Sequence, residues 1–196
     1  LWNVKAYEAR VLDEVGVDAH ALALQIERHT DALTVHAQAL LVQTLWRVGE
    51  KERARALLEK IRERVDETET QAHWESKTLG YGWLDDPVET TSAVLRALLM
   101  VEPTSPQVGR VVRWLVAYRK GGAWSSTRST AAVIDVFTEI ARSRPAERAP
   151  RGSAEVRVNG ALVADVPIDG PLLGERGAAA AFGLAGAGFA LGQFGG

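Results

Sequence analysis

The sequence predicts a mainly α-helical chain, a partial α/α toroid of alternating inner and outer helices with a short C-terminal β segment. Helices that are apolar around most of their circumference alternate with helices that carry one apolar stripe, as expected for two concentric layers. A Gly- and Trp-containing loop, a hydroxyl-rich helix start and an apolar helix occur twice. Aligning Ala93 with Ala132 gives a repeat of 39 residues. Near the C-terminus, an Asn-Gly pair separates two alternating segments, which indicates a β-hairpin.

The first half of the chain predicts two helices followed by an inner and outer pair. Apolar residues from Val4 to Val15 and from Ala19 to His29 indicate the first two helices. Residues 31–48 are apolar nearly all round and predict an inner helix, which Gly49 ends as a C-cap. Residues 50–66 predict an outer helix with one apolar stripe, formed by Ala54, Leu57, Leu58, Ile61 and Val65.

The alternation of inner and outer helices then continues. Residues 88–101 predict a second inner helix and residues 130–140 a third. Between them lies a second outer helix, whose predicted stripe consists of Val108, Val111, Val112, Leu115 and Val116.

The start of the second inner helix contains a pair of carboxylates. Asp85 and Asp86 resemble an acidic site, but Asp86 as N-cap, Pro87 at the first helical position and Glu89 two positions later form a helix-start pattern. We therefore interpret these residues as capping groups. The hydroxyl groups between Ser125 and Thr130 are interpreted in the same way, since no His or Lys base lies near them in sequence.

The composition changes after the third inner helix. We predict a helical domain over residues 1–142, a linker over residues 143–152 and a β-hairpin segment of a following β domain over residues 153–196. The strands are expected at Ala154–Val158 and Leu162–Val166, and the Ala/Gly-rich tail begins at Gly177. An isolated hairpin is only marginally stable, so these strands are expected to join a larger sheet.

Charge and composition argue against several classes of partner and of chemical site. The net charge of −2 comes from mixed charges spread along the chain, so nucleic acid is not an expected partner. The tail contains too much Gly for us to expect a membrane span. Cysteine is absent, which excludes disulfides and a Cys nucleophile within these 196 residues. The four histidines lack the spacing of a metal site, so we expect neither a metal nor a cofactor.

Three segments together resemble the thioester-domain toroid of bacterial α2-macroglobulins. They are the run Trp74–Leu99 with Tyr-Gly-Trp-Leu-Asp-Asp-Pro, the run Gly121–Val133 with Gly-Gly-Ala-Trp-Ser-Ser, and the segment Val48–Leu58 with Gly-Glu followed by Ala-Arg-Ala-Leu-Leu. The hairpin between Val156 and Val166 is similar to the sheet segment that follows the toroid in that family.

The resemblance implies a function without enzymatic turnover. It implies a large, periplasmic, cell-surface or secreted protease trap, in which a Cys-to-Gln thioester acylates the attacking protease. The expected partners are proteases and other domains of the same full-length protein. The thioester motif is missing from this chain, and in the family it lies upstream of the helices seen here. This segment is then expected to shield a thioester or an interface carried elsewhere.

Five residues are candidates for a binding role. Aromatic side chains at loop-to-helix junctions, Trp74, Tyr81, Trp83 and Trp124, are expected to be buried packing or interface groups, although they also suit a binding cavity. His73 precedes the first Trp loop and, by the resemblance, is a weak candidate for a histidine near a thioester.

Two alternatives remain open at the level of sequence. An α/α-toroid enzyme of the terpene cyclase or prenyltransferase type also has Gly-x-Trp loops, but it needs an acidic cluster at the cavity mouth or zinc ligands. Asp85 and Asp86 are the only candidate for these. A non-catalytic helical-repeat scaffold is the third possibility, although it would be expected to carry polar residues on its concave face.

Overall fold

The computed structural model describes residues 1–75, 86–143, 151–158 and 161–169. The chain divides into two compact units, Leu1–Phe137 and Thr138–Gly196. The first unit is built mainly from helices, and the second contains the end of the last helix and a pair of strands. The predicted mainly α-helical fold is confirmed.

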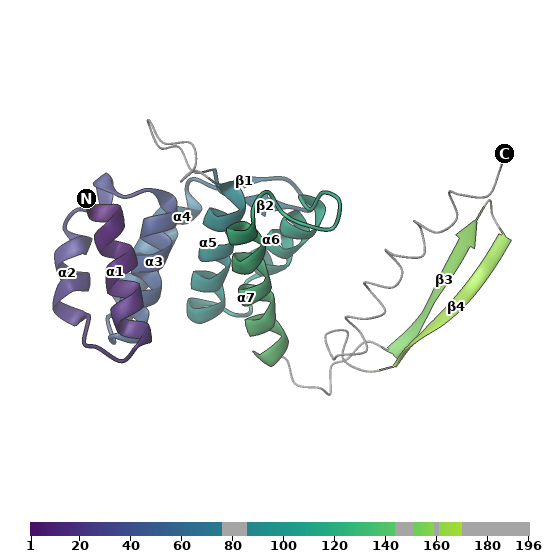
Figure 1. Ribbon diagram of the computed structural model, residues 1–196. Coiled ribbons are helices and arrows are strands. Elements are labelled where there is room, and N and C mark those ends of the chain that lie inside the picture. Colours follow the sequence, from purple (N-terminus) through teal and green to yellow (C-terminus); the bar gives the residue numbers. More distant parts are fainter. Residues whose placement is uncertain (76–85, 144–150, 159–160, 170–196) are drawn as a thin grey trace. The chain divides into compact units, whose positions relative to one another are not determined.

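The elements follow one another in the predicted order (Figure 1). The helices are α1 (Trp2–Glu14), α2 (His20–Glu27), the short 3₁₀ helix η1 (Thr30–Ala32), α3 (Val35–Arg47), α4 (Lys51–Arg62), α5 (Pro87–Val101), α6 (Pro106–Ala117) and α7 (Thr127–Ser143). Strands β1 (Asp66–Glu67) and β2 (Ala72–His73) pair antiparallel and lie between α4 and α5 in the sequence. Each of them is two residues long.

The helices of the first unit form two rows. In the inner row, α3 packs between α1 and α5, and hydrogen bonds from Ser125 and Ser129 place α7 against α5. In the outer row, α2 packs on α1 and α3, α4 packs on α3 and α5, and α6 packs on α5. Each outer helix is thus adjacent to one or two inner helices.

Burial follows this arrangement. The inner helices α3 and α5 are buried around most of their circumference, including polar residues such as Gln43 and Thr91. By contrast, α4 buries one stripe that agrees with the predicted one at Ala54, Leu57, Leu58 and Ile61. In α6, Val108, Val111 and Leu115 of the predicted stripe are buried, whereas Trp114 is buried in addition and the predicted Val116 is 55% exposed.

The third inner helix differs from its prediction. Only one face of α7 is buried, formed by Ser129, Val133, Val136 and Ile140 at helical spacing, whereas Ile134 is 56% exposed. The apolar content of residues 130–140 is compatible with either one or two covered faces. In the described residues, α5 packs on one side of α7 and no helix is described on the other.

Helix ends are set by local groups. The inner helix expected from residue 31 instead begins at Val35, because Thr34 is the N-cap and accepts a hydrogen bond from the Ala37 N–H at 3.3 Å. The predicted stop at Gly49 is confirmed. Gly49 has φ +96°, and the Glu50 N–H donates to the Leu45 carbonyl at 2.9 Å, as in a Schellman motif.

The second unit contains the expected hairpin. Strand β3 (Arg151–Val158) pairs antiparallel with β4 (Ala161–Asp169), with a bulge beside Arg157. The strands are longer than predicted, so Arg151 belongs to β3 rather than to the linker. Residues 144–150, the Asn159-Gly160 turn and the Ala/Gly-rich tail lie outside the described residues, and the division into domains stays a prediction. Within the described part, no helix has the length and apolar character required to span a membrane.

Candidate functional site

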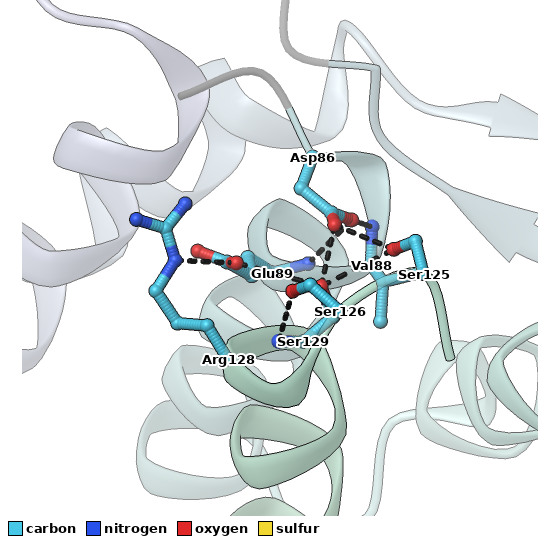
Figure 2. A network of polar contacts seen from close by, with 7 residues as sticks. All are labelled: Asp86, Val88, Glu89, Ser125, Ser126, Arg128 and Ser129. Carbon is cyan, nitrogen blue, oxygen red and sulfur yellow. Dashed lines mark hydrogen bonds and ion pairs between the residues drawn. The ribbon is translucent and has the colours of Figure 1, made fainter. Parts of the chain in front are cut away.

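The start of α5 is organised by a single carboxylate. One side-chain oxygen of Asp86 accepts hydrogen bonds from the Val88 N–H at 2.7 Å and the Glu89 N–H at 3.4 Å (Figure 2). Pro87 occupies the first turn, where its missing N–H costs nothing. The predicted capping role of Asp86 is confirmed.

The second oxygen of Asp86 reaches the start of α7. Ser125 donates to it at 2.6 Å, and the Ser129 hydroxyl donates to it as well. Ser126 accepts from the Ser129 N–H at 3.0 Å and thereby caps α7. We call the six residues Asp86, Glu89, Ser125, Ser126, Arg128 and Ser129 the Asp86 cluster; Figure 2 shows how they join the two helix starts.

Ion pairs continue the connection between α5 and α7. Arg128 donates from Nε to Glu89 Oε1 at 2.6 Å, and further along the helices Arg96 pairs with Asp135. In each pair, as in the pair of Asp86 with Ser125, the two residues are 39 positions apart. Residues at the same position of successive repeats therefore contact each other.

The environment of Asp86 keeps it ionised. Burial raises its pKa, but hydrogen bonds from Ser125, Ser129 and the backbone N–H groups of Val88 and Glu89 outweigh burial, so the pKa lies below its usual value. A carboxylate with a lowered pKa is a weak general base at neutral pH. Ser125 and Ser129 therefore donate their hydroxyl hydrogens to an ionised carboxylate.

His36 lies close to the cluster on the first turn of α3. Burial lowers its pKa, the charge of Glu89 opposes this shift, and the charge of Arg128 adds to it. His36 is consequently neutral at pH 7. No motif in the sequence indicates that His36 lies here.

Trp74 is fully buried and tied to two helices. Its indole N–H donates to the Ile61 carbonyl near the end of α4 at 2.9 Å. Its backbone N–H donates to the Thr91 hydroxyl of α5 at 3.1 Å. These contacts fix the segment after β2 between α4 and α5.

Trp124 makes a similar contact with the next outer helix. Its indole N–H donates to the Leu115 carbonyl in the last turn of α6 at 2.8 Å, and its ring meets the edge of Phe137 in α7. Trp124 is only half-buried, in contrast to the expected full burial, because it lies in the exposed Gly121–Ser126 loop. Trp74 and Trp124 each pack on a different outer helix.

His73 is part of an aromatic stack. Its ring lies parallel to Trp114 with 4.5 Å between centroids, and Trp114 stacks in turn on Tyr118 at 4.6 Å. His73 Nε2 lies 3.3 Å from Glu75 Oε1. Tyr81 and Trp83 lie outside the described residues, so the aromatic candidates are not brought together into one described cavity.

Two aspects of the site were not predicted from the sequence. The first is that Asp86 serves two helices, and the second is the use of the Trp74 indole as a donor to α4. The repeat of 39 residues contained a signal for the first, since Asp86, Glu89 and Arg96 have Ser125, Arg128 and Asp135 at the equivalent positions. In the described ranges, no group of three or more His, Cys, Asp or Glu residues is placed to hold a metal ion.

Comparison with known proteins identifies one family. The model of the A-macroglobulin TED domain matches residues 8–139, which include all the inner and outer helices except the first turns of α1 and the last turn of α7. No curated protein matches the chain.

Proposed function

Because this chain belongs to the A-macroglobulin thioester-domain (TED) family, we propose that it is part of an α2-macroglobulin-like, broad-spectrum protease-trapping inhibitor. In this proposal the helical unit packs around and shields a thioester or an interface that other parts of the full-length protein carry. The observation that carries the proposal is the family match over residues 8–139.

The chemistry of the described residues supports a shielding role. The chain has no cysteine, so it cannot itself form a Cys-to-Gln thioester. Asp86 and the serines near it are engaged in capping, and the lowered pKa of Asp86 makes it a poor base. The segment is therefore proposed to contribute no catalytic turnover of its own.

The arrangement of the helices fits the same proposal. Two adjacent rows, with the inner helices α3 and α5 buried on most sides, are what a segment of an α/α toroid requires. We propose that the rows belong to such a toroid, that the aromatic residues Trp74, Tyr81, Trp83 and Trp124 pack within it or at a domain interface, and that His73 has a packing role. The full-length protein is proposed to act in the periplasm, at the cell surface or after secretion, with proteases as its partners.

A cyclase or prenyltransferase is not favoured. Such an enzyme would need free carboxylates to hold the metal ions that bind a diphosphate. Asp86 already accepts four hydrogen bonds from groups of α5 and α7. Asp85 lies outside the described residues.

The proposal is tested by comparing this chain with the full-length protein. Each is mixed with a serine protease, and covalent adducts are sought by denaturing electrophoresis and mass spectrometry while residual protease activity is measured. The chain alone is expected to give neither an adduct nor inhibition, because it lacks a reactive acyl group. The full-length protein is expected to give one or both.

Two further measurements make this test decisive. Treating the full-length protein with a small primary amine beforehand consumes a thioester, and should abolish the adduct if a thioester forms it. Metal-dependent turnover of a prenyl diphosphate by the chain alone, abolished by changing Asp85 and Asp86 to Asn, would contradict the trap and establish the cyclase.

A further inference from the structure

An open cavity of about 270 Å³ lies between two helices of the outer row. One wall comes from the end of α2 and from η1, and the other wall comes from α4. The lining residues of α4 follow one another at helical spacing and therefore lie on one face of that helix. They are Arg53, Ala56, Leu57 and Lys60.

An ion pair joins the two walls. Arg53 Nη1 lies 2.5 Å from Glu27 Oε2 near the end of α2, and Arg53 Nε lies 3.2 Å from Glu50 Oε2. The carboxylate of Glu27 lines the cavity as well, but it is already engaged by Arg53. This pair therefore holds the end of α2 against α4 and adds no excess charge to the lining.

Two further cations of the lining are not balanced in this way. The side chains of Arg28 and Lys60 form no ion pair and no hydrogen bond with the residues that the structure describes. Both side chains are exposed, so a ligand in the cavity can reach them. Because Arg53 is balanced by Glu27, the described lining keeps an excess of two positive charges.

A hydroxyl group adds a neutral hydrogen-bond donor. Thr30 begins η1, and its carbonyl accepts hydrogen bonds from the Gln38 side chain at 2.8 Å and from the Leu33 N–H at 3.1 Å. These bonds fix the position of Thr30 in the lining. Its hydroxyl has no partner among the described residues and is not enclosed, so it can donate to a ligand.

Charge and size select the ligand. A carboxylate would neutralise one of the two unbalanced cations, whereas a phosphate monoester carries a charge of about −1.5 to −2 at pH 7 and accepts several hydrogen bonds. The cavity has the volume of about nine water molecules, so a phosphate group leaves room for a small organic group. Ala56 and the buried Leu57 provide apolar surface for that group.

We propose that this cavity binds a phosphate dianion. Its oxygens accept hydrogen bonds from Arg28, Lys60 and the Thr30 hydroxyl, and an organic group esterified to it lies against Leu57. The phosphate comes either from a small phosphate monoester or from inorganic phosphate. No residue of this cavity belongs to the Asp86 cluster, so the proposal does not depend on protease trapping.

The test is a set of nuclear magnetic resonance titrations of the complete chain at low ionic strength, since salt screens exposed charges. Propyl phosphate, inorganic phosphate and butyrate are each added up to about 50 mM, because ligands of this size bind weakly. Propyl phosphate is expected to shift the signals of Arg28, Thr30 and Lys60 saturably. Butyrate carries a single charge and is expected to bind about fivefold more weakly at the same ionic strength.

Substitutions identify the site. Arg28→Gln and Lys60→Gln each remove one unbalanced cation and are expected to raise the dissociation constant for propyl phosphate about twofold to fivefold. Thr30→Val removes the hydroxyl without changing the charge and is expected to raise it about threefold. Lys120→Gln removes an exposed cation from the loop after α6 and is the matched control, which should leave binding unchanged.

The comparison of the two phosphates distinguishes the sources. Tighter binding of propyl phosphate supports an ester whose organic group contacts the apolar wall, and tighter binding of inorganic phosphate supports the free ion. The proposal is overturned if no saturable shift occurs, or if butyrate binds as tightly as propyl phosphate. It is also overturned if Thr30→Val binds like the wild type, or if Lys120→Gln weakens binding as much as Lys60→Gln does, since binding would then reflect general attraction to positive charge.

Discussion

Asp86 stabilises two helices with one carboxylate. One oxygen caps α5 and the other accepts from the serines at the start of α7. Because Asp86 and Ser125 are 39 residues apart, at equivalent positions of the repeat, this carboxylate joins successive repeats of the chain. Its loss is therefore expected to affect both helices.

Replacing Asp86 by Ala is expected to lower the free energy of unfolding by about 1–3 kcal/mol at pH 7, since a cap and two hydroxyl partners are lost. The pKa of Asp86 is lowered in the folded state, so its contribution is present above the pKa of the unfolded chain and is lost as the pH falls through the folded value. The difference between the two proteins should shrink below about pH 4. Urea unfolding between pH 7 and pH 3 checks this.

The control for that series is Asp66→Ala, which removes an exposed carboxylate from β1. It should change stability little at pH 7. A difference between wild type and Asp86→Ala that stays constant down to pH 3 would show that the charge of Asp86 is not what joins the helices.

Trp74 offers a second test at this scale. Trp74→Ala is expected to cost about 3–5 kcal/mol, the range for removing a large core aromatic. Trp74→Phe keeps most of the ring but leaves the Ile61 carbonyl without its donor, and should cost about 1–3 kcal/mol. Unfolding followed by circular dichroism measures both, with the half-buried Trp46→Ala as a milder comparison. Equal stability of Trp74→Phe and wild type would mean that the indole hydrogen bond contributes nothing.

Sequence patterns predicted which residues cap a helix more successfully than which residues of two different helices contact each other. Asp86, Pro87 and Glu89 act within four residues of one another, so their spacing determines what they do. The contact of Asp86 with Ser125 depends on how α5 and α7 pack, and no local pattern determines that packing. The burial of Trp124 was overestimated for the same reason.

The ends of the helices can be tested with two glycines. Gly49 ends α3 with φ +96°, and a Cβ added there would meet no atom within 4 Å, so Gly49→Ala introduces backbone strain alone. We expect a loss of about 1–2 kcal/mol. Gly109 lies inside α6, where an added Cβ comes no closer than 3.6 Å to Arg113, so Gly109→Ala should stabilise by about 0.5–1 kcal/mol. Thermal unfolding measures the change in stability caused by each substitution. Changes of the same sign for both variants would contradict this interpretation.

The sequence distinguished helices with one apolar stripe from helices that are apolar nearly all round. It predicted less well how many faces of a helix are covered by other helices. Periodicity distinguished α4 and α6, with their single stripes, from α3 and α5. It could not determine how many faces of α7 are covered, because the apolar residues between 130 and 140 are compatible with either one or several covered faces. The pairing of β3 with β4 was predictable because an Asn-Gly pair between two adjacent alternating segments is typical of a hairpin.

At the scale of the whole molecule, α1 carries an apolar stripe that faces solvent. Val4, Tyr7 and Val15 are 67%, 61% and 69% exposed. We expect the purified chain to be marginally stable and to self-associate through this surface. Val4→Lys combined with Val15→Lys should reduce the associated fraction, as measured by size-exclusion chromatography with light scattering.

Gln25→Lys, on the exposed face of α2, is the control for the added charge and should not change association. A monomeric wild-type chain with a high melting temperature would contradict the prediction. It would also weaken the proposal that this unit normally packs within a larger assembly.

The 39-residue contacts restrict how such a chain can arise by duplication. Asp86 faces Ser125, Glu89 faces Arg128 and Arg96 faces Asp135, so each contact joins two unlike residues at one repeat position. Two copies identical to the first would instead place Asp beside Asp, Glu beside Glu and Arg beside Arg, and these pairs repel. An array designed by repeating that first copy unchanged would therefore lose these contacts between neighbouring repeats.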